Sequence, residues 1–200
     1  DRSKAKREDI AKLMKDAGCY STGFSLESAN KEILEMMNKK VESEYFSEHV
    51  RILKKTGILT FTSIIFGYPI ETKETIRETF DMCEQNTLYP SIGYLLPLPY
   101  TEMYEYAKNN GYISDEDAYL ESITERQDLC LNMTQMSNEE IMDEIKAGAK
   151  RLNISLDLNL DESKLVKTGG YKKVADAGGA NKVLEQPEMI RNENDFSFNY

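Results

Sequence analysis

The first 111 residues alternate between two kinds of hydrophobic pattern. Three short stretches rich in apolar residues are predicted to be strands, at 19–28, 58–67 and 91–99. Around them, apolar residues recur every three or four positions, which is the spacing of an amphipathic helix. This spacing predicts helices at about 4–17, 30–37, 43–55, 72–83 and 101–109. Because strands and helices alternate with short connections, the pattern is typical of a parallel sheet covered by helices.

The pattern changes in the second half of the chain. One helix is predicted over 115–131, and a capping box formed by Ser137 and Glu140 predicts another that runs to about 152. The remaining residues are polar, rich in glycine and weakly periodic, as in loosely ordered segments. We therefore divide the chain into an α/β unit, a helical segment and a polar C-terminal extension, at 1–112, 113–156 and 157–200.

Composition narrows the classes of function. The formal net charge of −10 over 200 residues argues against non-specific binding to nucleic acid or to an anionic membrane surface. No apolar run has the length of a membrane span, and no signal peptide opens the chain. The three cysteines, Cys19, Cys83 and Cys130, are far apart and form no CxxC motif, which favours a reduced, cytoplasmic context.

Candidate chemistry lies on the predicted strands. Alternate residues of a strand share a face, and each strand has one bulky face and one smaller, partly polar face. We expect the smaller faces to line the interior of a barrel or sheet, and their residues are Gly23, Ser25, Glu27, Thr60, Thr62, Ile64, Ser91, Gly93 and Leu95. Glu27, Gly67 and Pro97 end their strands, where parallel α/β folds place binding sites. For Glu27 the pattern leaves a second interpretation open, a carboxylate that only caps the next helix.

Three segments carry a resemblance to a known family. "AGCYSTGFSLESANKEILEMMNKK", "GILTFTSIIFGYPIETKETIRETF" and "LLPLPYTEMYEYAKNNG" resemble successive blocks of the radical S-adenosylmethionine (SAM) superfamily. The nearest branch is the one often fused to a cobalamin-binding domain, with cyclase-like and methylthiotransferase-like members. The blocks cover about residues 15–111 in the expected order.

The resemblance implies a partial, TIM-like (β/α) barrel in which the three predicted strands are the fourth to sixth. It implies that Glu27 and Ser28 lie near the nucleoside of SAM or the substrate, and that the turn Gly67, Tyr68, Pro69 approaches the adenine. Pro97 belongs to the loop after the sixth strand. Ser25 and Thr62, on the smaller strand faces, complete the candidate cofactor-binding set. We expect no catalytic and no metal-binding residue in this chain.

Two departures from the family pattern affect these expectations. The CxxxCxxC motif is absent, and the chain opens on Asp1, so we expect the C-terminal half of a longer protein that is inactive alone. In the intact protein the resemblance implies SAM, a [4Fe–4S] cluster and an optional upstream cobalamin domain, with none of them bound to this fragment. Ala29, Ile70 and Tyr100 stand where the family has glycine, so their loops are expected to differ in shape.

The expected function is that of part of an oxidoreductase or of a methyl or methylthio transferase. The alternative is a non-catalytic interaction or scaffold domain derived from half a barrel. The expected partner is the missing N-terminal half of the barrel. A cut barrel also exposes strand edges, so a homodimer across the open edge is a further expectation, with the C-terminal extension as a competing cover.

Overall fold

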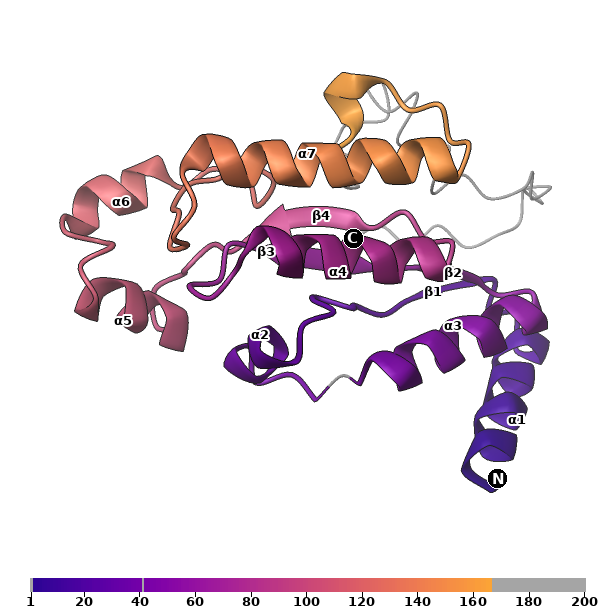
Figure 1. The fold of residues 1–200 in the computed structure, drawn as a ribbon. Helices are drawn as coiled ribbons and strands as arrows, with labels where there is room; N and C mark the ends of the chain where they lie inside the picture. Colours follow the sequence, from indigo (N-terminus) through magenta and orange to yellow (C-terminus); the bar gives the residue numbers. More distant parts are fainter. Residues whose placement is uncertain (1, 41, 167–200) are drawn as a thin grey trace, which may run out of the picture.

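Three parallel chain segments form the centre of the computed structural model, which describes residues 2–40 and 42–166 (Figure 1). The first holds β1 (Ser21–Gly23), the second β2 (Leu59–Phe61) and β3 (Ser63–Phe66), and the third β4 (Ser91–Tyr94). β1 pairs with β2 and β3 pairs with β4, in both cases in parallel. The parallel arrangement of the three predicted strands is therefore confirmed, and their spatial order follows the chain.

The middle strand is interrupted at Thr62, which forms hydrogen bonds with both neighbouring segments. The Leu26 N–H donates to the Thr62 hydroxyl oxygen (2.9 Å), and the Ser91 N–H donates to the Thr62 carbonyl (2.8 Å). Just beyond, Glu27 forms a parallel bridge with Ile64. Thr62 thus joins the two strand pairs, with its side chain replacing a backbone acceptor on one side.

The helices follow the predicted pattern with one main exception. Their bounds are α1 (Arg2–Asp16), α2 (Lys31–Met36), α3 (Ser43–Thr56), α4 (Lys73–Gln85), α5 (Glu102–Asn109), α6 (Glu116–Ser122), α7 (Asn138–Ser155) and the 3₁₀ helix η1 (Glu162–Lys164). Capping boxes open α4 at Thr72 and α7 at Ser137, since each hydroxyl accepts a hydrogen bond from the backbone N–H three residues on. The predicted capping box of Ser137 and Glu140 is confirmed.

The exception is the helix predicted over 115–131, which is wrong beyond Ser122. The backbone turns extended at Ile123, and the following segment runs beside β4, where the Tyr94 N–H donates to the Arg126 carbonyl (2.7 Å). The Arg126 carbonyl thus bonds to the edge of the sheet instead of to an N–H group within a helix. Because this hydrogen bond joins residues far apart in the sequence, the local hydrophobic pattern did not reveal it.

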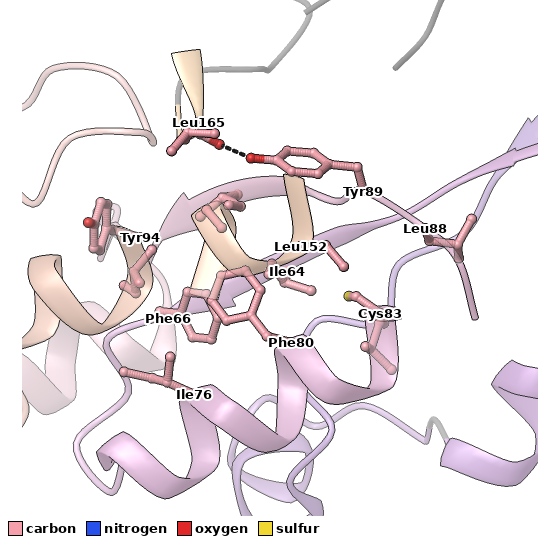
Figure 2. Close-up of a cluster of buried hydrophobic side chains, with 14 of the residues drawn as sticks. Ile64, Phe66, Ile76, Phe80, Cys83, Leu88, Tyr89, Tyr94, Leu152 and Leu165 are labelled. Atoms are coloured by element: carbon pink, nitrogen blue, oxygen red, sulfur yellow. Dashed lines mark hydrogen bonds between the residues drawn. The ribbon is translucent and has the colours of Figure 1, made fainter. Parts of the chain in front are cut away.

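One face of the strands is covered by α4 and α7, which lie alongside each other in Figure 1. The main core forms there. Figure 2 shows Phe66 of β3 against Phe80 of α4, with ring centroids 5.5 Å apart. Apolar residues of α7, among them Ile141 and Ile145, are fully buried in the same cluster. Burying a large apolar side chain stabilises the fold by roughly 1.5–3 kcal/mol, so this layer holds the strands together.

The predicted inner face of the middle strand is wrong. Ile64 pairs with Ile92 and is fully buried on the helix-covered side, as is Thr62. The opposite, open face carries Phe61, Ser63 and Ile65 instead. The prediction ranked faces by bulk and polarity, but β-branched Thr and Ile pack well under helices, whereas Phe61 remains 47% exposed. For the first and third strands, Ser25 and Ser91 do lie on the same face as Ser63.

Part of the predicted polar extension packs on the core. Leu160 and Leu165 are buried in the main cluster, and the Tyr89 hydroxyl donates to the Leu165 carbonyl at 2.6 Å (Figure 2). Residues 167–200, the rest of the predicted extension, lie outside the described residues. Over the ranges that the structure describes, no helix is both long and apolar enough to cross a membrane.

Candidate functional site at the strand ends

Glu27 is the most unusual residue at the carboxyl ends of the strands. Its backbone is left-handed (φ 62°), a conformation that costs a non-glycine residue about 1–2 kcal/mol. Its side chain is only 9% exposed and lies 3.3 Å from the Lys39 ammonium through Oε1. Its second oxygen, Oε2, is buried without a hydrogen-bond partner. Strain together with an unsatisfied buried carboxylate oxygen makes Glu27 a candidate ligand-binding residue.

The interpretation of Glu27 as a helix cap is wrong. The N-cap of α2 is Asn30, whose side-chain oxygen accepts hydrogen bonds from the N–H groups of Glu32 (3.1 Å) and Ile33 (3.2 Å). The donors at the start of α2 are therefore satisfied without Glu27. Its carboxylate remains available to a ligand.

Ser28 lies beside Glu27 but its hydroxyl is occupied by the protein. It accepts a hydrogen bond from the Asn30 N–H (3.1 Å) and lies 3.4 Å from the Thr79 hydroxyl of α4. Thr79 also accepts a hydrogen bond from the Ala29 N–H (3.0 Å). Ser28 thus braces the loop after the first strand against α4, and it positions Glu27.

The turn after β3 is held by a residue that the sequence pattern did not single out. Gly67 has a φ of 104°, and its N–H donates to Glu71 Oε2 (3.3 Å). The other oxygen of Glu71 accepts a hydrogen bond from the Thr75 hydroxyl, and the Glu71 N–H donates to the Tyr68 carbonyl (2.8 Å). The sequence held one indication of this role, since an acidic residue directly before the N-cap Thr72 suits the positive end of the α4 helix dipole.

Burial shifts two ionisable groups in this turn. Burial raises the pKa of Glu71 to about 7, although hydrogen bonds from Thr75 and Gly67 oppose the shift. Burial, with the nearby charge of Glu27, raises the pKa of Tyr68 to about 12. The Tyr68 hydroxyl is therefore protonated at neutral pH and is a hydrogen-bond donor close to the Glu27 carboxylate.

The structure separates the other predicted site residues. Thr62 is buried on the helix-covered side with its hydroxyl bonded to Leu26, so it does not reach the open face. Ser25 lies on the open face, 2.6 Å from the Ser63 hydroxyl. Pro97 is buried, and its carbonyl accepts a hydrogen bond from the Tyr119 hydroxyl (2.6 Å), which ties the loop after β4 to α6. Pro69 is half-buried within the turn that follows Gly67.

The loop at Tyr100 keeps the backbone conformation that glycine favours. Tyr100 has a φ of 69° and is fully exposed, whereas Ala29 and Ile70 do not have a positive φ. We expect Tyr100→Gly to stabilise the fold by about 0.5–1 kcal/mol, because relief of left-handed strain outweighs the entropy cost of glycine. Urea unfolding measures this change. Ile70→Gly is the control and should destabilise, so a gain at both positions would refute the explanation.

The cysteines do not fit an iron–sulfur cluster. Among the described residues, no group of three or more Cys, His, Asp or Glu side chains could hold a metal ion. Cys19, Cys83 and Cys130 are free thiols, and burial raises the pKa of Cys83 to about 12. Because a cluster is bound by neighbouring thiolates, these residues cannot provide its ligands.

A cavity of about 350 Å³ lies away from the strand ends. It is bounded by α1, α3 and β1, and its lining is mostly apolar, with Ile10, Met14, Phe24 and Ile52 among the residues. Such a lining offers few groups to recognise a polar cofactor. The candidate site is therefore the cluster around Glu27, Gly67 and Tyr68.

The described residues form an α/β unit of parallel strands with a polar candidate site at their carboxyl ends. Residues 2–83 match the family model of the Radical SAM superfamily, so this part of the chain is similar to that superfamily. The resemblance seen in the sequence is thereby confirmed.

Individual relatives match about half of the chain. An uncharacterized methyltransferase, PH0819, of Pyrococcus horikoshii is 33% identical over 107 residues, which are 53% of this chain and 23% of that protein. The anaerobic magnesium-protoporphyrin IX monomethyl ester cyclase of Rubrivivax gelatinosus is 26% identical over 113 residues, 56% of this chain and 20% of that protein. The chain thus spans about a fifth to a quarter of the length of these curated relatives.

A solved structure supports the fold. Coproporphyrinogen III oxidase (HemN) from Escherichia coli, a radical SAM enzyme, aligns with a TM-score of 0.53 at 17% sequence identity. The alignment covers 74% of this chain and 30% of that one. At this identity the likeness concerns the fold and says nothing about the substrate.

Proposed function

We propose that this chain is the C-terminal part of a radical SAM barrel and that its strand ends bind the nucleoside of SAM. The observation that carries the proposal is Glu27 Oε2, an acceptor buried without a partner. A buried carboxylate oxygen gains most from a hydroxyl donor, and the ribose of SAM supplies two. Gly67, which has no side chain, leaves room for close approach to the backbone, and Tyr68 adds a donor.

The same proposal includes the reaction of the intact protein. With a cluster held by residues outside the described part of this chain, SAM supplies radical chemistry. Methyl or methylthio transfer and oxidation are the candidate reactions, since the relatives named above are a methyltransferase and a cyclase. The roles of the present residues are to bind and orient the nucleoside. A cytoplasmic location is part of the proposal.

The partner that we propose is the remainder of the barrel, paired to the outer edge of β1. β1 ends the row of described strands, and unpaired edges favour pairing with a further strand. Ile10 of α1 lines the apolar cavity together with Thr22 of β1, and both Ile10 and Leu13 of α1 are exposed. Leu59 and Phe61 are exposed on the open face, so a second copy of this chain is the alternative partner for that surface.

Calorimetric titration with S-adenosylhomocysteine tests the nucleoside site, because this ligand needs no cluster. We expect saturable binding by the wild-type chain and about tenfold weaker binding by Glu27→Gln, the loss of one charge-assisted hydrogen bond. Glu32→Gln, an exposed change on α2, is the matched control and should bind like the wild type. Absence of binding, or equal affinity for Glu27→Gln, would refute the proposal.

A further inference from the structure

Three serines form a row across the open face of the strands. Ser25, Ser63 and Ser91 come from the three parallel segments in turn. The Ser25 and Ser63 hydroxyls are 2.6 Å apart, and Ser63 is the register partner of Ser91. Because α4 and α7 cover the other face, these hydroxyls lie on the face opposite those two helices.

Arg126 lies at the end of this row. Its backbone is fixed at the edge of the sheet by the hydrogen bond from the Tyr94 N–H, and its Nη2 donates to the Ser91 hydroxyl (2.6 Å). Its side chain crosses Gly93, where an added Cβ would lie 3.7 Å from Nη1 and 3.8 Å from Cδ. Gly93 faces the same side as Ser91, so the guanidinium is placed over the open face rather than in bulk solvent.

The side chain of Arg126 has a shape and charge that suit an anion. A guanidinium carries five N–H donors in a planar fork that matches a carboxylate. Apolar groups of Phe61 and Ile65 share the face with the serines, and a partly apolar surface strengthens such hydrogen bonds. The chain has a formal net charge of −10, which disfavours general binding of anions.

We propose that Arg126, with Ser91 and Ser63, binds a carboxylate of the ligand that occupies the open face. The inference deepens the proposed function, on which it rests, by assigning a carboxylate-bearing ligand to the interior of the barrel. Two sources share this chemistry, a carboxylic acid substrate and the methionine end of SAM. Arg126 comes from the segment after α6, beyond the residues that match the superfamily, and so is a candidate determinant of specificity for this chain.

Nuclear magnetic resonance of the arginine side chains provides the test. The probe is succinate, and succinamide is its uncharged analogue. We expect succinate to shift the Arg126 Nε–Hε signal saturably and succinamide to leave it unchanged. Succinate binding to the variants is followed through the backbone amide signals of β4. Arg126→Gln should weaken this binding at least about tenfold. Arg126→Lys should weaken it less, because a lysine keeps the positive charge but lacks the planar fork of N–H donors.

Arg51→Gln, an exposed change on α3, is the control and should bind succinate like the wild type. If Arg126→Gln does not fold, Arg126→Lys and Ser91→Ala decide, since the proposal requires weaker binding in both. A repeat with saturating S-adenosylhomocysteine separates the sources: competition assigns the carboxylate to SAM, and simultaneous binding assigns it to a second ligand. A missing shift, or a shift that persists in Arg126→Gln, would overturn the proposal whatever the calorimetric result at Glu27.

Discussion

Replacing Gly148 by alanine is expected to destabilise the protein by about 1–3 kcal/mol, although alanine is the better helix former. Gly148 lies in the middle of α7, where propensity alone predicts a gain of about 1 kcal/mol. In the folded protein we expect a loss of stability instead of this gain, because a Cβ at this position would lie 2.5 Å from Phe80 Cε2. Carbon atoms pack at about 3.5–4.0 Å, so α4 and α7 would have to separate or Phe80 would have to leave its rotamer.

A double-mutant cycle with Phe80→Leu shows whether this contact is the cause. The smaller side chain gives room for the new methyl group, so Gly148→Ala should cost less in the Phe80→Leu background. Ala147→Gly, at an exposed position one residue earlier, measures the propensity term by itself. Stabilisation by Gly148→Ala, or an equal cost in both backgrounds, would contradict the close approach of the two helices.

Glu71 is expected to make stability fall as the pH rises from about 4.5 to 7. Its folded pKa is raised to about 7, chiefly by burial, so the folded state holds the proton more tightly than the unfolded state. Its contribution is complete below the unfolded pKa and is lost as the pH passes the folded pKa. A shift of this size corresponds to about 3 kcal/mol. Glu71→Gln has no proton to lose and should lack this dependence.

The measurement is the free energy of unfolding of the wild type and of Glu71→Gln from pH 4 to 8. The wild type should lose stability relative to the variant as the pH rises through this range. Glu74→Gln provides a control, because hydrogen bonds from its own backbone N–H and from Thr72 lower the Glu74 pKa. That contribution is constant above the unfolded pKa of about 4.5 and is lost only as the pH falls below it, at the acid end of the range. A constant difference between wild type and Glu71→Gln would show that Glu71 is not buried in this way.

If the carboxylate of Glu71 loses its proton near neutral pH, the turn that it holds is affected as well. Glu71 bonds the Gly67 N–H directly, and Gly67 begins the segment that we propose approaches the nucleoside. Stability and nucleotide affinity would then respond to pH over the same range. The calorimetric titration proposed for Glu27, repeated at pH 6 and pH 8, would compare the two.

The hydrophobic pattern by itself determined most of the helices and strands and the parallel arrangement of the strands. Long-range packing was not needed to place α4 or α7, because Thr72 and Ser137 supply their caps locally and the apolar spacing sets their buried faces. The sequence blocks around Glu27 and Gly67 also pointed to the superfamily before the fold was known. These features are local, so they can be recognised in a single chain.

The tertiary structure alone decided which face of the middle strand is covered, because Phe61 and Ile64 are both suited to burial and only the position of α4 and α7 separates them. It also decided that residues after Ser122 leave the helix, since their backbone finds a partner at the edge of β4. The hydrogen bond of Glu71 to Gly67 and the position of Arg126 over Gly93 have the same origin. Each depends on groups brought together across the sheet or the turn, and the free energy of such contacts is not a property of any one segment.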